Sequence, residues 1–234
     1  TSRGAGLVVR PGIDSVDDLP GTTLSTPQLA NTQDVALRWF AQEQGWDVDT
    51  EGGGDLSIIP QDNSDIINAF ELGEIDGAWI PEPHLSRVLA EDDAHLLIDE
   101  PELWEETDGQ YVTTLLVVSA EFLESDPGAV ADLLRGHVTS VDWINDHPEE
   151  AAETSRTHLE ALTGGELDPE LTTAAFENVT FTVDPVAPSL LVQAEQAEAI
   201  GLLDPVDLNG IYALDPLNDV LAEAGHARVA GLEG

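Results

Sequence analysis

Four uncharged polar side chains lie close together where an expected strand is followed by an expected helix: Gln28, Asn31, Thr32 and Gln33. Residues 22–26 favour a strand, because β-branched threonines flank Leu24 and a glycine and a proline bound the run. The first turn of the helix has backbone N–H groups without intrahelical partners, and the helix dipole adds positive potential there. These features suit an anion-binding site, but the local sequence alone favours the ordinary alternative, a capped helix after a strand that binds nothing.

The helix that must position these side chains begins near Asn31 or Thr32, either of which is a good N-cap. Asp34 places a negative charge in the first turn, where the dipole favours it. Gly45 ends the helix. Apolar side chains follow at helical spacing and form one face: Val35, Trp39 and Phe40.

Strand and helix patterns alternate through the first hundred or so residues. Strands are expected at residues 5–10, 22–26, 56–60, 77–80 and 95–98, with helices between most of them. This alternation indicates a mainly parallel α/β sheet covered on both faces. Ligands bind at the carboxyl ends of such strands, and residues 28–33 and 79–82 both follow strands, so the two groups can converge.

The later part of the chain has a different pattern. Residues 111–119 form a long β-branched run that predicts a strand, and helical patterns dominate from Ser119 onward. An Asp-Pro pair repeats a helix start signal, with Asp as N-cap and Pro as the first helical residue, at Asp126, Asp168, Asp184 and Asp215. We assign these pairs no chemistry.

Residues 26–38 (TPQLANTQDVALR) resemble the signature of the aliphatic-sulfonate, taurine and nitrate family of ABC-transporter substrate-binding proteins. Residues 73–83 (GEIDGAWIPEP) and 113–118 (TTLLVV) are also similar to that family. Fainter similarities follow in family order at residues 143–145, 148–152 and 181–185. The chain departs from the family where Ala30 replaces the usual glycine and His84 replaces the aromatic residue of many relatives.

This resemblance implies an α/β fold, the two-lobed type II fold of periplasmic binding proteins. Residues 1–11 would be the hinge strand and a remnant of lobe one, residues 12–111 lobe two, and residues 112–234 the return crossover and C-terminal helical part of lobe one. Family members carry a secretory or lipoprotein signal and several strand–helix units before the point that matches Thr1. We therefore expect an N-terminally truncated chain with one incomplete lobe.

The resemblance further implies capture of a small oxyanion outside the cytoplasm, such as an alkanesulfonate, taurine or nitrate, and its delivery to an ABC permease. The expected partners are the anionic solute and the permease. The protein would be a monomer, held at the membrane only through a lipid anchor of the full-length chain or through the permease. Three alternatives stay open: a ligand-sensing domain of the same fold without transport, a binding protein related to thiamin-pyrimidine synthesis, and a truncated remnant that binds no ligand.

The resemblance favours an anion-binding site at Gln28, Asn31, Thr32 and Gln33 over an ordinary capped helix. It also adds four residues to the expected binding site: Trp79, Glu82, Thr113 and Asp184. Trp79 would form an apolar wall for an alkyl tail, and the alternative is a core position on a buried strand. Glu82 lies at the same corner but equally fits a cap of the next helix. Thr113 and Asp184 match family positions near the cleft, whereas β-propensity and helix capping explain them without a ligand.

The charge of the chain is strongly negative. Its 234 residues include 47 Asp or Glu and 7 Arg with no Lys, giving a net charge of −40, while 41% are hydrophobic, which indicates a folded core. Acidic residues spread evenly along the chain, together with the absence of Lys, are typical of halophilic proteins. A mesophilic protein that binds cations or basic partners usually has its acidic residues in clusters. No basic patch is present for nucleic acid or an anionic membrane. In about 1 M salt the Debye length is roughly 3 Å, so distant carboxylates would be screened from a bound anion.

Residue types argue against most enzyme chemistry. Cysteine is absent, so there is no thiol nucleophile or thiolate metal site, and the six His residues show no paired ligand spacing. Phosphate-loop and serine-hydrolase motifs are also absent. Pyridoxal-phosphate enzymes of the same fold superfamily need a Lys for the Schiff base, and this chain has none. We therefore expect a binding protein rather than an enzyme, with no cofactor and no metal.

Overall fold

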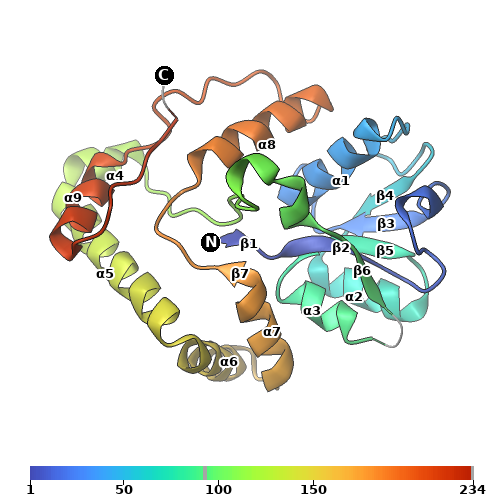
Figure 1. Ribbon diagram of the computed structural model, residues 1–234, viewed down its shortest axis with the longest axis horizontal. Helices are drawn as coiled ribbons and strands as arrows, with labels where there is room; N and C mark the ends of the chain where they lie inside the picture. The colour runs from blue at the N-terminus through green and yellow to red at the C-terminus, as the bar shows by residue number, and fades with distance from the viewer. Residues whose placement is uncertain (92–93, 233–234) are drawn as a thin grey trace. The chain divides into compact units, whose positions relative to one another are not determined.

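The computed structural model describes residues 1–91 and 94–232, which form two compact units (Figure 1). Unit 1 comprises Thr1–Ser2, Gln110–Leu191 and Asp207–Gly234, and unit 2 comprises Arg3–Gly109 and Val192–Val206. The lobe boundaries at residues 11 and 111 stay predictions.

Unit 2 contains a five-stranded sheet, made of β2 (Ala5–Val9), β3 (Thr23–Thr26), β4 (Ser57–Pro60), β5 (Gly77–Pro81) and β6 (His95–Asp99). Its helices are α1 (Thr32–Glu43), α2 (Asn63–Leu72) and α3 (His84–Leu89), with 3-10 helices η1 (Val16–Asp18), η2 (Glu100–Leu103) and η3 (Glu105–Thr107). All five strands lie within two residues of their predicted bounds.

The strand order is β4-β3-β5-β2-β6, as Figure 1 shows. β3 runs parallel to both β4 and β5, whereas β2 is antiparallel to β5 and to β6. The predicted mainly parallel sheet is therefore confirmed, and β2 is the exception. β2 is buried along its whole length and paired on both sides, so it is an integral part of this sheet.

Helices cover both faces of this sheet. On one face Leu37 of α1 packs with strand residues such as Leu24. On the other face Ile66 of α2 and Leu85 of α3 pack with Ile80 and its neighbours. The helix α2 ends at Gly73 in the left-handed region, where glycine has no steric penalty, and it buries four residues: Ile66, Ile67, Ala69 and Phe70.

Unit 1 is mainly helical. It contains α4 (Ala120–Ser125), α5 (Pro127–Asp146), α6 (Pro148–Thr163), α7 (Pro169–Asn178) and α9 (Asp215–Ala224). A small sheet pairs β1 (Ser2–Arg3) with β7 (Val179–Thr180), and α8 (Ala187–Ala199) continues from unit 1 into unit 2. Val138 of α5 packs against Leu217, Val220 and Leu221 of α9 to form a core.

The Asp-Pro start signals have mixed outcomes. The Asp126 side chain accepts the Ala129 N–H at 3.0 Å and the Asp168 side chain accepts the Glu170 N–H at 2.8 Å, so both are N-caps as predicted. Asp215 is the first residue of α9 rather than its cap. The prediction at Asp184 is wrong, because α8 begins only at Ala187.

The strand predicted over residues 111–119 is also wrong. Val112 makes one isolated antiparallel bridge with Ser2, and residues 113–118 belong to no described strand. Leu116 and Val117 are 49% and 79% exposed. A strand is stabilised by hydrogen bonds to a neighbouring strand. In the described part of unit 1, the backbone of this run pairs only with the short N-terminal segment at Thr1 and Ser2.

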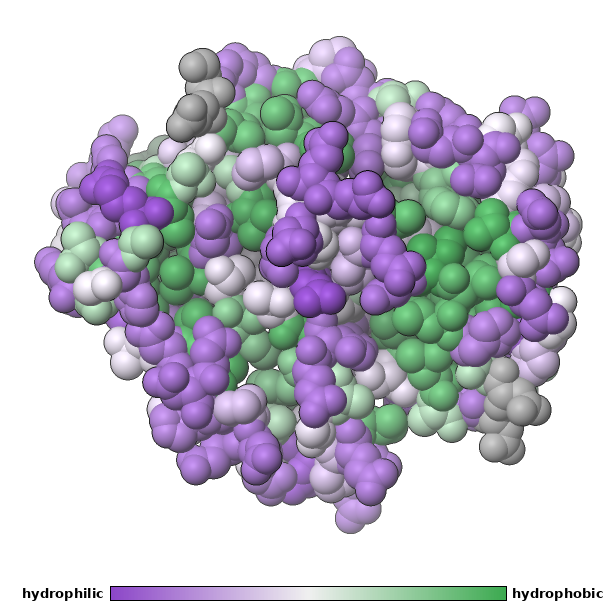
Figure 2. Space-filling view, viewed as in Figure 1, coloured by the Kyte–Doolittle hydropathy of each residue, from purple (hydrophilic) through white to green (hydrophobic). Residues whose placement is uncertain are grey.

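The surface agrees with the composition. Figure 2 shows hydrophilic residues over most of the visible face, with apolar side chains between them over the sheet of unit 2. No helix in the described residues is both long enough and apolar enough for a membrane span.

Candidate anion-binding site

The carboxyl ends of three parallel strands meet at one edge of the sheet in unit 2. β3 ends at Thr26, with β4 on one side ending at Pro60 and β5 on the other ending at Pro81. The Gln61 N–H donates to the Thr26 carbonyl at 2.8 Å, which ties the first two chain ends together. The loop after β3 leads into α1, so the N-terminus of α1 lies at this edge.

Asn31 is the N-cap of α1, as predicted. Its Oδ1 accepts the Asp34 N–H at 2.8 Å, and its carbonyl accepts the Val35 N–H at 2.9 Å. Thr32 is the first helical residue. The backbone N–H groups of Thr32 and Gln33 have no hydrogen-bond partner in the described chain, so both are free to bind an anion.

Asp34 does not compete for these two donors. Its side chain is fully buried and accepts from the Thr26 hydroxyl at 2.7 Å, the Ala30 N–H at 2.9 Å and the Arg38 Nε at 2.9 Å. The guanidinium neutralises the carboxylate, and the three bonds hold the loop between β3 and α1 in place. The N–H of Ala30 donates to Asp34 and is therefore not available to a bound anion.

Sequence reasoning identified Asp34 but missed its partner Arg38. Arg38 is 3% exposed and also donates through Nη1 to the Asp49 carbonyl at 2.6 Å. The i,i+4 spacing of Asp34 and Arg38 on one helix is the signal that would have found the pair.

The uncharged side chains around the helix start differ in exposure. Gln28 is exposed, Asn31 and Thr32 are half-buried, and Gln33 is 5% exposed. The Gln28 and Gln33 amides make no hydrogen bond to any part of the chain that the structure describes, so they are available as donors. Sequence reasoning did not single out Gln61 and Asn63, which follow β4 at the same edge; their position directly after a predicted strand was the available signal.

Trp79 is a correction. Its side chain is 0% exposed and packs in the core of unit 2 with Leu7 and Leu24, and its Nε1 donates to Glu100 Oε2 at 2.7 Å. A fully buried indole offers no surface to an alkyl tail. The apolar wall expected from this residue is therefore wrong, and the alternative of a core position holds.

Glu82 has a capping role. Its Oε2 accepts the Ser86 N–H at 3.1 Å and its Oε1 accepts the Ser86 hydroxyl at 2.9 Å, so the carboxylate binds the first turn of α3. His84 follows it and is half-buried. Burial lowers the pKa of His84 first, and the positive charge of Arg87 lowers it further. The imidazole is therefore neutral near pH 7 and adds no positive charge to this corner.

Thr113 and Asp184 belong to unit 1, whereas the other expected site residues belong to unit 2. The Thr113 N–H donates to the Thr1 carbonyl at 3.1 Å, and its hydroxyl lies 3.0 Å from that of Thr1. Asp184 Oδ1 accepts the Val186 N–H at 2.8 Å and so closes a local turn. Both side chains thus have structural partners within their own unit.

No cluster of three or more His, Cys, Asp or Glu side chains suited to a metal ion occurs among residues 1–91 and 94–232. The α1 N-terminus presents neutral donors, which suit a negatively charged group.

Comparison with known proteins agrees with this architecture. The sequence profile of the NMT1-like family matches residues 13–159, which is more than half of the chain. No curated protein matches the sequence.

Solved structures show the same fold at low sequence identity. A protein from Bordetella bronchiseptica RB50 has a TM-score of 0.71 at 16% identity, covering 96% of this chain and 73% of its own. The periplasmic aliphatic sulphonate binding protein SsuA from Escherichia coli has a TM-score of 0.62 at 17% identity, covering 85% of this chain and 63% of its own.

The periplasmic nitrate-binding protein NrtA from Synechocystis PCC 6803 has a TM-score of 0.64 at 13% identity, covering 94% of this chain and 61% of its own. The chain thus spans less than two thirds of the length of SsuA and of NrtA. The fold is that of periplasmic binding proteins, and the chain belongs to the NMT1-like family.

Proposed function

We propose that this chain is part of a solute-binding protein that captures a small oxyanion outside the cytoplasm and delivers it to an ABC importer. The similarity to proteins named for sulphonate and nitrate binding supports this proposal, because both ligands present negatively charged oxygens. The protein acts by binding rather than by catalysis. The full-length protein is a monomer, held at the membrane by a lipid anchor or by its permease.

One observation carries the proposal. The free N–H groups of Thr32 and Gln33 lie at the positive end of α1, and the acidic side chain of its first turn, Asp34, is already neutralised by Arg38. The amides of Gln28 and Gln33 supply further donors. The anion is therefore held by neutral groups, with Asn31 fixing the geometry of the helix start.

The available donors are sufficient for useful affinity. Hydrogen bonds to a charged group contribute about 1.5–3 kcal/mol each, so three of them supply roughly 4.5–9 kcal/mol. A dissociation constant of about 1 μM corresponds to roughly 8 kcal/mol. Two backbone donors and one side-chain amide therefore reach micromolar binding at the upper end of this range.

Removing one backbone donor tests the proposal. Thr32→Pro deletes a single N–H, and proline is favoured at the first helical position. Asn31 already has ψ 174°, the extended conformation that a residue before proline adopts. In calorimetric titrations with taurine, ethanesulfonate and nitrate in about 1 M salt, we expect Thr32→Pro to bind the ligand of the wild-type protein roughly 10- to 150-fold more weakly.

Two matched variants accompany this test. Thr32→Ala keeps the N–H and should bind like the wild type. Asn31→Asp keeps an N-cap side chain but adds a negative charge, so binding should weaken while the unfolding midpoint changes little. Equal affinity of the proline and alanine variants, or no heat with any of the three ligands from folded protein, would reject this site.

A further inference from the structure

Glu100 is a buried acid without a cationic partner. Only two carboxyl side chains, Asp34 and Glu100, are buried in the described part of the chain. Asp34 is paired with Arg38. Glu100 is 1% exposed, and its hydrogen-bond donors are two neutral indoles. A carboxylate in such a place has lost its hydration without gaining a counter-charge.

The two indoles come from different parts of unit 2. Trp79 is on β5 in the middle of the sheet, and its Nε1 donates to Glu100 Oε2 at 2.7 Å. Trp104 follows η2 and also hydrogen-bonds to the Glu100 side chain. Glu100 therefore joins the core to the segment formed by residues 100–109, which we call the connector because unit 1 resumes at Gln110.

The nearby cation Arg3 acts on Asp99, and no positive charge in the described part of the chain acts on Glu100 itself. β2 and β6 pack against η2, and β2 has no ionisable side chain. On β6, the Nε2 atom of His95 lies 3.0 Å from the Ile13 carbonyl oxygen. Asp99, also on β6, carries a negative charge that repels an ionised Glu100. Burial first, and then Asp99, raise the pKa of Glu100 to about 7, against the lowering effect of the two indole hydrogen bonds.

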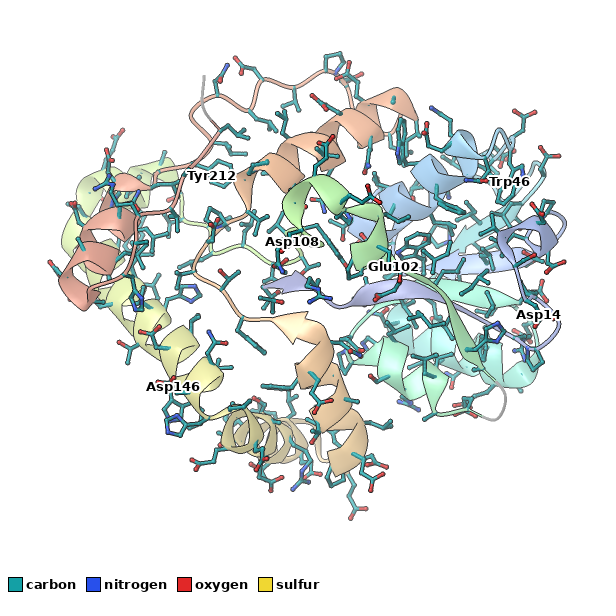
Figure 3. The ribbon with its side chains drawn as sticks, viewed as in Figure 1. Asp14, Trp46, Glu102, Asp108, Asp146 and Tyr212 are labelled. Atoms are coloured by element: carbon teal, nitrogen blue, oxygen red, sulfur yellow. The ribbon has the colours of Figure 1, made fainter. Side chains whose placement is uncertain are left out.

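Only two side chains of the connector, Glu100 and Trp104, are buried. It consists of the two 3-10 helices η2 and η3 and ends in a turn where the Gly109 N–H donates to the Trp104 carbonyl at 2.9 Å. Its other acidic side chains, among them Glu102 and Asp108 (Figure 3), are exposed. A segment with few buried contacts opens at a lower free energy than the whole unit.

We propose that Glu100 is a proton-controlled latch that holds the connector against the core of unit 2. As a neutral acid, Glu100 can stay buried and still accept an indole N–H through its carbonyl oxygen. As a carboxylate, it gains hydration when the connector lifts away. The same proton therefore controls how firmly residues 100–109 are attached to the sheet.

The direction of the pH dependence follows from the two states of the connector. When the connector is open, Glu100 has its ordinary pKa of 4.5, and when it is closed the pKa is about 7. The closed state thus binds the proton more tightly and is most favoured below about pH 4.5. The equilibrium constant for opening the connector increases about tenfold per pH unit between these two pKa values and levels off above pH 7.

Indole N–H resonances of tryptophan-labelled protein test the latch. The chain has five Trp residues, and we expect the signals of Trp79 and Trp104 to titrate together near pH 7. Amide hydrogen exchange at Gly109, corrected for its intrinsic pH dependence, should lose protection by about 100-fold between roughly pH 5 and pH 8. Amides of α1 should keep their protection over the same range.

Two single substitutions separate Glu100 from its neighbours. Glu100→Gln keeps an acceptor for an indole but cannot ionise, so both signals and the Gly109 protection should become independent of pH. Glu102→Gln, on the same 3-10 helix, should behave like the wild type. If both indole signals titrated while the protection of Gly109 stayed constant, Glu100 would ionise without the connector opening. If neither signal titrated between about pH 5 and pH 9, Glu100 would not ionise in that range. Either result overturns the latch.

Discussion

Ala30 sits in the loop that leads to α1, with a φ of +62° in the left-handed region. In that region the Cβ of any residue except glycine crowds the following carbonyl oxygen. The family resemblance marked this position as one where relatives have glycine, and the backbone gives the physical reason. The N–H of Ala30 donates to Asp34 at 2.9 Å, so the turn must be kept despite the strain.

We predict that Ala30→Gly stabilises the protein. Relief of the left-handed strain contributes about 1–2 kcal/mol, and the larger conformational freedom of glycine in the unfolded chain removes roughly 0.5–1 kcal/mol of that gain. The net increase in the free energy of unfolding should be about 0.5–1 kcal/mol in urea titrations. Ala36→Gly inside α1 is the control and should lose about 1 kcal/mol; a similar loss for Ala30→Gly would contradict the strain argument.

At the residue scale, local chemistry was predictable and tertiary partners were not. The cap at Asn31 follows from the type of residue and its place before an apolar periodicity, and it is confirmed. Trp79 could not be assigned from sequence, because a tryptophan on a strand suits a cleft and a core equally well. Its burial depends on Glu100, an acid 21 positions away that accepts its indole N–H.

At the scale of elements, unit 2 was largely predictable and the run over residues 111–119 was not. The strands of unit 2 are short apolar runs bounded by glycine, proline or polar residues, and each finds a neighbour within the same unit. Residues 113–118 have the same β-propensity, but residue type does not supply a hydrogen-bonding neighbour. Propensity therefore failed where pairing decides the structure.

The connection between β3 and α1 depends on the buried Asp34–Arg38 pair. We predict that Asp34→Asn destabilises the protein by about 3–5 kcal/mol, because it leaves a buried guanidinium without a counter-charge. The loss should be similar in about 0.1 M and 1 M salt, since buried pairs are little screened. Chemical unfolding at both salt concentrations measures it.

The exposed pair between Arg135 and Glu223 is the control for this prediction. Glu223→Gln should have a small effect that disappears in high salt, as expected for a solvated ion pair. If Asp34→Asn lost no more stability than Glu223→Gln, the loop before α1 would be held by something other than the buried pair.

At the scale of the whole molecule, the net charge of −40 works against the compact state. Salt shortens the Debye length from about 10 Å at 0.1 M to roughly 3 Å at 1 M and so reduces the repulsion between distant carboxylates. We predict that the midpoint of thermal unfolding rises by several degrees over this range, measured by circular dichroism at neutral pH.

Repeating the melting series at about pH 4, where Asp and Glu are partly protonated, separates charge screening from other effects of salt. The increase in the unfolding midpoint caused by salt should be smaller at this pH, because less repulsion between carboxylates remains to be screened. An equal gain at both pH values would assign the effect to the hydrophobic core instead.

β2 lies in the interior of the sheet of unit 2, yet it is synthesised before both strands that pair with it. Ala5 pairs with Pro81 and Gly6 with Asp99, so β2 gains its neighbours only after the chain through Pro81 and then Asp99 has left the ribosome. Pairing across such sequence separations is slow and leaves apolar strands unshielded in the meantime. We therefore expect the nascent chain to depend on holdase chaperones, which bind exposed apolar segments, more than the folded and highly charged protein does.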